Sequence, residues 1–214
     1  MIGTFIIIDL SGFSALTEAH GDEAAVALAQ TFAATIRDLL PANGRLLKTM
    51  GDAGLIVIPD TEAALDFVSA LWKKLSVRGF LMLRAGIHHG EAVEIEGDVF
   101  GAAVNLTARL AALATAGQIV ASGGVAAAAA KAGFDVTGLG PFSLKNLRDP
   151  VELYSLRLDD AESGIDVVDP VCRMRVEYER AAGRLQYEGR EYSFCSLECA
   201  SRFADSPSTY AAHR

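Results

Sequence analysis

Two polar side chains stand four residues apart in the otherwise apolar stretch "DVFGAAVNLTARL", residues 98–110. If this stretch is a helix, Asn105 and Arg109 lie on one face, because residues i and i+4 are neighbours on a helix surface. A guanidinium held in place is well shaped to meet the charge of a phosphate group. The same spacing also occurs on ordinary solvated helix faces, so the pair by itself leaves both interpretations open.

Two aspartates occupy the ends of predicted strands. Asp9 ends the apolar run "FIIID", and Asp52 lies in the Gly-Asp turn of "KTMGDAG". In a β-α-β-β unit these positions are neighbouring strand ends, so we expect the two carboxylates to converge at one edge of the sheet. There they would suit two divalent ions about 3.5–4 Å apart, as in two-metal phosphoryl chemistry. The alternative is that Asp9 caps the following turn and Asp52 completes a hairpin.

Gly12 follows the first strand, where backbone N–H groups are suitably placed to cradle phosphates. The elements that must position these residues follow from hydrophobic periodicity. Their order at the start of the chain is β-α-β-β-α-β, which predicts an α+β fold with a ferredoxin-like sheet and helices on one face. The predicted strands are 4–9, two within 44–60, two within 81–98, 117–122, 134–140 and 151–158. The predicted helices are 22–40, 61–75 with Thr61 as the N-cap, the stretch around Asn105, and 124–133.

Composition and charge exclude several classes of protein. The chain has 214 residues, of which 51% are hydrophobic and 21% charged, as in globular domains. No apolar run approaches the roughly 20 residues that a membrane span needs, and the first residues lack a basic signal region, so we expect a cytoplasmic protein without a membrane partner. The net charge is −8, and the whole acidic excess lies before residue 167. An acidic body argues against a nucleic-acid partner.

Cysteine marks a second module. All three cysteines lie in the last 43 residues, and the composition changes at "LDDAESGIDVV". We therefore predict a first domain at 1–158, a linker at 159–166 and a small domain at 167–214. An odd number of cysteines without a secretion signal argues against a disulfide framework.

The cysteine spacing suggests a metal site. Cys195 and Cys199 are one helical turn apart, and a hairpin around "YEGREY" would bring Cys172 close to them. Thiolates of this kind suit Zn²⁺ or a softer ion such as Cu(I), and a metal would help so small a module to fold. The alternative is three buried thiols in a small core, since no fourth ligand is evident in the sequence.

The first module resembles the class III nucleotide cyclases. The motifs "IIIDLSGFS", "KTMGDAG", "RAGIHHGE", "GDVFGAAVNLTARL" and "LKNLRDPVELYSL" occur in the order, and at about the spacing, of that family and cover residues 4–157. The resemblance implies an adenylyl cyclase that converts ATP to 3′,5′-cyclic AMP and pyrophosphate with two Mg²⁺ or Mn²⁺ ions. It also implies a homodimer whose sites combine metal aspartates from one subunit with the Asn and Arg of the other.

The resemblance assigns a role to each matching residue of this sequence. Asp9 and Asp52 would bind the metals, Lys48 and Asp98 would read the adenine, Asn105 would position the ribose, Arg109 would stabilise the transition state, and Lys145 would contact the triphosphate. Gly12 and Phe13, which follow the first strand, are further candidate substrate-binding residues. Lysine can donate to adenine N1, and aspartate can accept from the 6-amino group. Guanylyl-specific relatives carry Glu and Cys-like residues there, so the Lys–Asp pair favours ATP.

This sequence departs from the cyclase pattern in a few places. Gly54 and Phe100 replace larger residues, and the segment between His88 and Asp98 is short, which leaves the dimer geometry open. We interpret His88 and His89 as turn and sheet residues.

The alternative function is a non-catalytic cyclase-like nucleotide-binding or dimerisation module whose working part is the tail. A diguanylate cyclase or polymerase palm shares the sheet and the aspartates but not the other four residues.

The tail resembles the YHS domain, a TRASH-like metal-binding module. "DPVCRM", "YEGREYSFCSLEC" and the spacing of a later Phe and Tyr carry this resemblance. Arg173 stands where that pattern usually has Gly. The resemblance implies that Cys172, Cys195 and Cys199 bind a metal and leaves its identity open.

Overall fold

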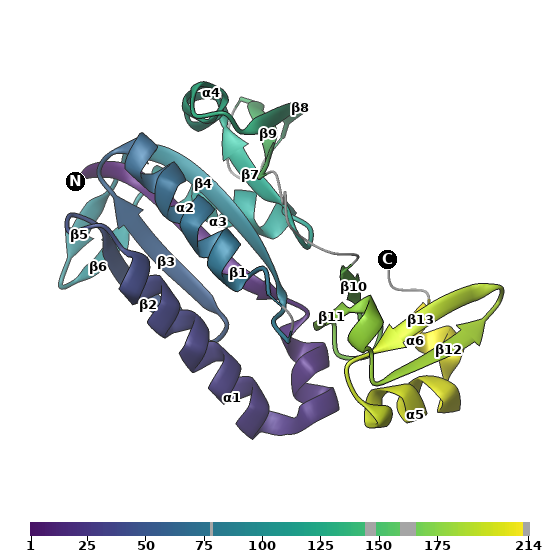
Figure 1. The fold of residues 1–214 in the computed structure, drawn as a ribbon. Coiled ribbons are helices and arrows are strands. Elements are labelled where there is room, and N and C mark those ends of the chain that lie inside the picture. Colours follow the sequence, from purple (N-terminus) through teal and green to yellow (C-terminus); the bar gives the residue numbers. More distant parts are fainter. Residues whose placement is uncertain (78, 144–148, 159–165, 212–214) are drawn as a thin grey trace.

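A seven-stranded sheet forms the centre of the first module in this computed structural model, which describes residues 1–77, 79–143, 149–158 and 166–211 (Figure 1). The strand order is β2-β3-β1-β4-β7-β9-β8, and every neighbouring pair is antiparallel except β4 and β7. The strands are β1 (Ile2–Ser11), β2 (Arg45–Met50), β3 (Ala53–Ile58), β4 (Met82–Glu91), β7 (Ile119–Ser122), β8 (Asp135–Phe142) and β9 (Val151–Arg157). A separate hairpin pairs β5 (Val93–Ile95) with β6 (Asp98–Phe100).

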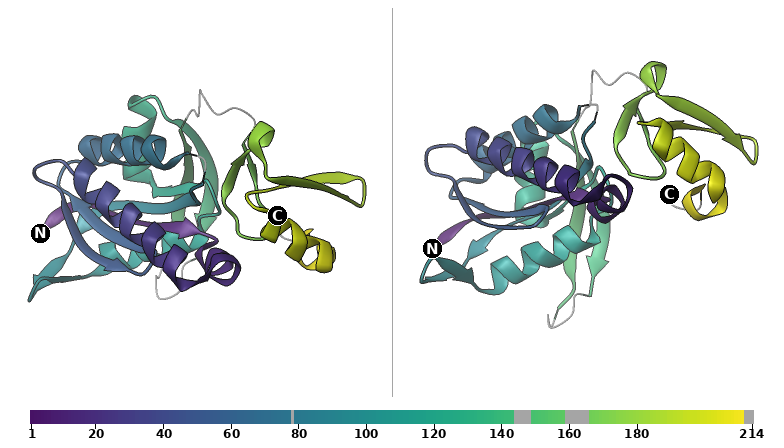
Figure 2. Two further views of the ribbon diagram at one scale, coloured as in Figure 1. Left: turned by 60° about the horizontal axis from the view of Figure 1, so that its bottom comes forward. Right: turned by 90° about the horizontal axis from the view of Figure 1, so that it is seen from below.

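Helices cover both faces of this sheet. They are α1 (Phe13–Leu39), α2 (Thr61–Leu75), α3 (Ala102–Leu113) and α4 (Gly123–Lys131). Figure 2 shows α1 and α2 on one face and α3 on the other. The predicted α+β fold is confirmed: the β-α-β-β-α-β order is present and its own two helices share one face. Helix α3 adds a layer that this motif lacks.

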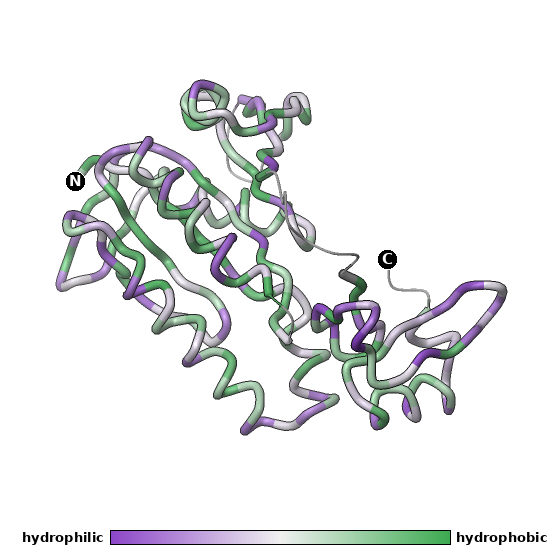
Figure 3. The backbone as a smooth tube through the Cα atoms, viewed as in Figure 1, coloured by the Kyte–Doolittle hydropathy of each residue, from purple (hydrophilic) through white to green (hydrophobic). Residues whose placement is uncertain are grey.

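The centre of strand β1, residues 5–8, is apolar, and both of its faces are covered there. Ile6 and Ile8 pack with the core under α1 and α2, whereas Phe5 packs with Ala103 of α3. Successive side chains of a strand point to opposite faces, so a central strand buried on both sides reads as a continuous apolar run. The neighbouring β3 is also hydrophobic over most of its length (Figure 3).

Helix α1 starts earlier than the periodicity predicts. The predicted helix at residues 22–40 corresponds to its second part, but α1 begins at Phe13 and is interrupted at Gly21, whose φ of 84° is not helical. The first part was missed because it is short and has no long apolar stripe of its own. Its Ala19 is buried among residues of the tail, so tertiary packing rather than local pattern stabilises this segment.

The N-cap of α2 differs from the prediction. Asp60, not Thr61, is the cap, and its carboxylate accepts a hydrogen bond from the backbone N–H of Ala63 at 2.8 Å. The Thr61 hydroxyl instead pairs with the hydroxyl of Thr4 in β1. Both residue types can cap a helix. In this structure Asp60 caps α2, and the side chain of Thr61 is engaged with β1.

The tail is a small module of two hairpins and short helices. Its elements are β10 (Asp166–Val168), β11 (Arg175–Glu177), a 3₁₀ turn (Tyr178–Arg180), β12 (Gly183–Tyr187), β13 (Arg190–Phe194), α5 (Leu197–Asp205) and α6 (Pro207–Ala211). The hairpin expected around "YEGREY" is the β12–β13 pair. Strand β10 begins inside the predicted linker, and residues 159–165 lie outside the described residues. The module lies beside the first part of α1 (Figures 1 and 2).

No helix among the described residues is long and apolar enough to cross a membrane.

Candidate functional site

Asp9 and Asp52 meet at the end of β1. Asp9 faces Ala53 in the β1–β3 register, and the backbone N–H of Leu10 donates to the carbonyl of Asp52 at 3.3 Å. Burial raises the pKa of Asp52, and the nearby charge of Asp9 raises it further. A partly buried carboxylate beside a second carboxylate is a donor set that suits a divalent cation. The residues therefore fit the metal pair that the sequence predicted.

Arg84 holds the Asp9 carboxylate from the neighbouring strand. Its Nε donates to Oδ1 at 2.6 Å and its Nη2 donates to Oδ2 at 2.8 Å, because Asp9 and Arg84 face each other in the β1–β4 register. Hydrogen bonding to Asp9 raises the pKa of Arg84. Each carboxylate oxygen keeps a second lone pair for another partner. Arg84 was not among the predicted site residues, although a cation inside the apolar strand "LMLRAGI" was a signal for it.

The predicted nucleotide residues share one face of the sheet. Asp9 lies on the same face of β1 as Phe5, because the two are four residues apart in the strand. Phe5 packs against α3. Lys48 is paired with Leu55, which belongs to the same cluster as Phe5, and paired residues of neighbouring strands point to the same side. The face opposite α1 and α2 thus carries Asp9, Lys48 and helix α3.

Lys48 and Asp98 form an ion pair, with Lys48 Nζ 2.8 Å from Oδ2 and 2.7 Å from Oδ1 of Asp98. The lysine comes from β2 and the aspartate from the β5–β6 hairpin. The hydrogen bond from Lys48 lowers the pKa of Asp98, so this carboxylate stays ionised. The two residues expected to read the purine are therefore neighbours, and each side chain remains about 42% exposed.

Asn105 and Arg109 lie on the outer face of α3. The helix buries Ala103, Thr107 and Leu110, which places Asn105 and Arg109 away from the sheet. Within the described part of the chain neither of these two side chains has a hydrogen-bond or ion-pair partner. Both a solvated helix face and a site completed by a second subunit would leave these two side chains without a partner in a single chain.

The position of α3 depends on a close approach to β4. A Cβ built at Gly86 would lie 2.2 Å from the backbone nitrogen of Ala111 and 2.5 Å from the carbonyl oxygen of Thr107. Gly86, the first glycine of "RAGIHHG", is therefore required where the backbone of the helix contacts the strand. This contact determines where Asn105 and Arg109 stand.

The turn after β1 leads directly into the N-terminus of α1. Gly12 has a φ of 90° and is the N-cap of α1, so the first backbone N–H groups of the helix follow it directly. The stem of Arg173 lies against Gly12, since a Cβ at Gly12 would be 2.6 Å from that of Arg173. Phe13 packs on the main core. Lys145, the other predicted phosphate contact, lies outside the described residues.

The β5–β6 hairpin presents apolar side chains to solvent. Val93, Ile95 and Phe100 are 60%, 55% and 53% exposed. They stand beside Asp98 on the short segment between His88 and the helix α3. This is the kind of surface that a partner subunit covers.

His88 and His89 both lie in β4. The Nδ1 of His88 is 2.8 Å from the hydroxyl of Ser122, and burial lowers the pKa of His88. The Nδ1 of His89 is 3.0 Å from the hydroxyl of Thr4. Both are sheet residues, as expected, and each has a hydroxyl partner.

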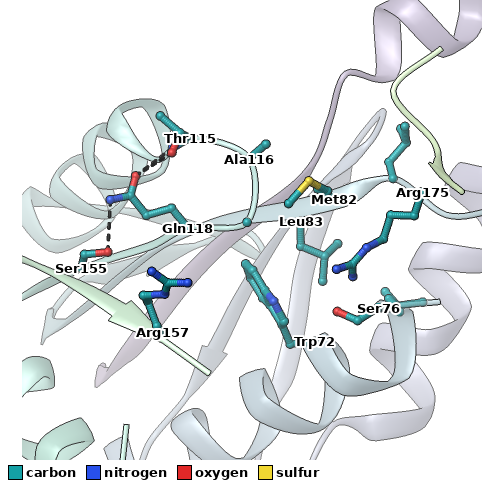
Figure 4. A pocket seen from close by; sticks show the side chains of 13 residues that line it. Trp72, Ser76, Met82, Leu83, Thr115, Ala116, Gln118, Ser155, Arg157 and Arg175 are labelled. Carbon is teal, nitrogen blue, oxygen red and sulfur yellow. Dashed lines mark hydrogen bonds between the residues drawn. The ribbon is translucent and has the colours of Figure 1, made fainter. Parts of the chain in front are cut away.

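A cavity of about 390 Å³ lies between α2, β4 and β9 (Figure 4). Figure 4 shows Trp72, Arg157 and Arg175 around it, and Gln118 bonded to Thr115 and Ser155. None of the predicted nucleotide residues lines this cavity. The candidate active site is therefore the sheet face that carries Asp9 and Lys48 and not this cavity.

The three cysteines of the tail converge. The sulfur of Cys195 is 3.4 Å from that of Cys172 and 3.7 Å from that of Cys199. Cys195 precedes α5, and the hydroxyl of the cap residue Ser196 accepts from the N–H of Cys199. Hydrogen bonds from Cys172 and then Cys195 lower the pKa of Cys199, which favours a thiolate there. The Nε2 of His20 in α1 stands 3.7 Å from the sulfurs of Cys195 and Cys199.

Asp169 supports the cysteine cluster from behind. This fully buried carboxylate accepts from the backbone N–H groups of Val171 at 2.8 Å, Cys172 at 3.3 Å and Cys195 at 2.8 Å. It thereby joins the two loops that carry cysteines. Asp169 was not among the predicted site residues, although the pair Asp169–Pro170 is a turn signal close to Cys172.

Arg173 adopts the left-handed conformation with a φ of 66°. A glycine enters that region without strain, which gives a physical reason for the glycine that YHS-like sequences usually have at this place. Here the arginine carries the strain and places its stem on Gly12.

Comparisons with known proteins identify both modules. Residues 3–158 match the family model described as adenylate and guanylate cyclase catalytic domain, and residues 167–214 match the YHS domain. The chain is 34% identical over 166 residues to the pH-sensitive adenylate cyclase MT1302 of Mycobacterium tuberculosis, covering 75% of this chain and 42% of that protein. It is 37% identical over 108 residues to an adenylate cyclase of Streptomyces coelicolor, covering 50% of this chain and 28% of that protein. The chain thus spans less than half the length of these curated relatives.

Solved structures show the same fold. The crystal structure of the adenylyl cyclase CyaB from P. aeruginosa has a TM-score of 0.63 at 21% identity, covering 76% of this chain and 97% of that chain. The adenylate/guanylate cyclase/hydrolase from Silicibacter pomeroyi has a TM-score of 0.61 at 25% identity, covering 74% of this chain and 98% of that chain.

Proposed function

Because the chain belongs to the adenylate and guanylate cyclase family and carries a YHS domain C-terminal to the cyclase domain, we propose that it is an adenylyl cyclase. It converts ATP into 3′,5′-cyclic AMP and pyrophosphate at sites formed between two copies of the chain. The ribose 3′-oxygen forms a bond to the α-phosphorus, the bond from that phosphorus to the bridging oxygen of pyrophosphate breaks, and the 3′-hydroxyl loses its proton. The proposed cyclase domain comprises residues 1–158 and the YHS domain residues 167–214, with a linker at 159–166.

The observation that supports this proposal most is the shared sheet face. Asp9 and Asp52 meet at one strand end, Lys48 and Asp98 are already paired, and α3 lies on the same side. Mg²⁺ or Mn²⁺ bound by the two aspartates would lower the pKa of the ribose hydroxyl and neutralise phosphate charge. Arg84 orients the Asp9 carboxylate for that purpose.

The other residues act on the nucleotide itself. Lys48 donates to adenine N1 and Asp98 accepts from the 6-amino group, and the hydrogen bond from Lys48 keeps the Asp98 carboxylate ionised for that role. Asn105 positions the ribose, and the Arg109 guanidinium meets the charge that develops on the phosphate oxygens. The N–H groups after Gly12 hold the phosphates.

A homodimer would give Asn105 and Arg109, which lie on the side of α3 away from the sheet, a nucleotide to contact. Asn105 is exposed and Arg109 is half-buried, which suits contact with a nucleotide whose metals belong to the second subunit. The exposed apolar side chains of the β5–β6 hairpin suit burial at that interface. In the tail, Cys172, Cys195 and Cys199 bind a metal, either Zn²⁺ or a soft transition metal.

Product analysis of the purified chain tests the proposal. We expect Mn²⁺ with ATP to yield cyclic AMP, and Mn²⁺ with GTP to yield at least tenfold less cyclic product, because a mismatched base leaves polar groups unpaired. Cyclic GMP as the main product would contradict the substrate. Nucleotide binding without any cyclic product would contradict the activity and favour the non-catalytic alternative.

A further inference from the structure

Four metal-ligating atoms gather where the two modules meet. They are the sulfurs of Cys172, Cys195 and Cys199 and a ring nitrogen of His20, and all lie within 4.8 Å of one another. Cys172 and Cys199 are buried, and the other two residues are half-buried. His20 precedes the break at Gly21, so it belongs to the first part of α1 in the cyclase module.

Four of the six distances between these atoms are close to the edges of a metal tetrahedron, and the other two are within 4.8 Å. For metal–sulfur bonds of about 2.3 Å and a metal–nitrogen bond of about 2.0–2.1 Å, the ligands of a tetrahedral zinc ion are about 3.5–3.8 Å apart. The sulfur atoms of Cys172 and Cys195 are 3.4 Å apart, and those of Cys195 and Cys199 are 3.7 Å apart. His20 is 3.7 Å from each of Cys195 and Cys199. A disulfide would need about 2.05 Å between two sulfurs.

The segment that carries His20 is fastened to the tail by other contacts. Ala19 is buried in the tail's own core beside Val171, Cys199 and Phe203. The guanidinium of Arg202 in α5 donates to the backbone carbonyl of Glu18 at 2.8 Å. The two residues before His20 are therefore fixed to the tail, one by packing and one by a hydrogen bond, and they hold His20 beside the cysteines.

We propose that His20 completes a closed Cys₃His zinc site that the cyclase and YHS modules share. This inference rests on the proposed metal-binding role of the tail and adds the fourth ligand, its origin in the other module and the choice of Zn²⁺. Three sulfurs and one imidazole in tetrahedral positions are the donor set of structural zinc sites. Asp169 orients the loops of Cys172 and Cys195 as an outer-shell partner.

The shared site links metal binding to the phosphate turn of the cyclase module. His20 lies on the same helical segment that starts at Gly12 and Phe13. On the other side, Cys172 is followed directly by Arg173, whose stem lies on Gly12. Zinc bound by His20 and Cys172 therefore ties the turn at Gly12 to the tail from two directions.

Metal binding to three single variants of the full chain tests the proposal. We expect one tightly bound Zn²⁺ per chain in the wild type at this site, measured by competition with a chromophoric chelator after reduction of the thiols. Losing an outer-shell partner already costs about 10–100-fold in metal affinity, so His20→Ala should weaken binding by about 100-fold or more. His20→Cys should restore tight binding, and His89→Ala, a histidine outside the cluster, should change nothing.

Cobalt substitution shows whether His20 coordinates the metal. The wild type should give the visible absorption of tetrahedral Co²⁺ with thiolate ligands, and His20→Cys should shift that spectrum as a fourth sulfur replaces nitrogen. Identical affinity and identical spectra for wild type and His20→Ala would overturn the proposal while leaving a three-cysteine site intact. Preference for Cu(I) bound without His20 would overturn it too. Failure of the wild type to bind any metal would overturn both this proposal and the tail's proposed role, whatever the cyclase activity.

Hydrogen exchange tests the link between the modules. In the wild type, Zn²⁺ should slow amide exchange in peptides covering residues 12–20 as well as in those around Cys172 and Cys195. In His20→Ala at saturating Zn²⁺, protection should remain in the tail and disappear from residues 12–20. Equal protection of residues 12–20 in both proteins would contradict a shared site.

Discussion

Asp9 and Asp52 are close enough for the charge of Asp9 to act on the Asp52 carboxyl group. The pKa of Asp52 is raised by burial and by Asp9, whereas Arg84 binds both oxygens of Asp9. The two carboxylates are thus unequal: one is balanced by a cation of the protein, and the other depends more on an external cation. This asymmetry suits a site that holds divalent ions through both aspartates.

Removing either aspartate should abolish catalysis without unfolding the protein. We expect Asp9→Asn and Asp52→Asn each to lower cyclic AMP formation by on the order of 100-fold or more, because metal activation of the ribose hydroxyl is lost. The measurement is initial rate at saturating Mn²⁺ and ATP. Asp66→Asn, an exposed aspartate on α2, is the matched control and should keep its activity. Full activity in both site variants would contradict the two-metal proposal.

The Lys48–Asp98 pair gives a pH dependence with a defined sign. The pKa of Asp98 is lowered in the folded protein, so the pair stabilises the fold above the ordinary aspartate pKa, and this contribution is lost as pH falls through the lowered value. In Lys48→Met the pKa of Asp98 should rise towards that of a free aspartate, as measured by carbon NMR of its carboxyl group.

Glu94 is the internal control for that titration. Its pKa is lowered by a separate partner, Arg45, and should not move in Lys48→Met. An unchanged Asp98 pKa would show that the two groups are not paired in solution.

At the scale of elements, the approach of α3 to β4 is the contact that positions the catalytic helix. Gly86→Ala would place a methyl group against the backbone of α3 at Ala111 and Thr107. Overpacking usually costs about 1–3 kcal/mol, and backbone atoms yield less than side chains, so we expect a loss of about 3 kcal/mol or more. Activity should fall as well, because Asn105 and Arg109 move with α3.

Denaturant unfolding followed by Trp72 fluorescence measures this effect. Trp72 is the chain's single tryptophan and is buried in the cyclase module, so its signal reports on that module. Gly138→Ala is the matched control, since nothing lies within 4 Å of a Cβ at that glycine. Equal stability of Gly86→Ala and the wild type would mean that α3 does not pack so closely.

At the scale of the whole molecule, the active site is proposed to need two chains. Asn105 and Arg109 point outward, and the metal aspartates lie at a strand end of the same sheet face. Two variants damaged in different halves of the site can therefore complement each other. Asp9→Ala and Arg109→Ala should each be nearly inactive when expressed singly.

Co-expression of Asp9→Ala with Arg109→Ala should restore activity. A mixed dimer has one site with both defects and one intact site, so random pairing predicts about a quarter of wild-type activity. The assay is cyclic AMP formation by the purified mixture, with subunit exchange shown by two affinity tags. Mixed dimers without activity would contradict the interfacial site. An active Arg109→Ala protein would show that this residue belongs to a solvated face.

The local pattern of the sequence determined most of the fold. Apolar runs and helical periodicity located β1, β2, β3, α2 and α3 because each depends on neighbours in the chain, and five ordered motifs identified the cyclase family. The same local information located three cysteines and a hairpin between them. It misplaced the start of α1 and the cap of α2, since both depend on contacts with distant segments.

The tertiary structure decided which distant residues meet. Arg84 binds Asp9 because β1 and β4 are neighbours in the sheet, although 75 residues separate them in the chain. His20 reaches Cys199 across 179 residues, and nothing in the periodicity around a single histidine predicts that partner. Periodicity reports which face of an element is buried, whereas a metal site requires specific atoms from separate elements within a few ångströms. Only the packing of the tail on the first part of α1 brings those atoms together.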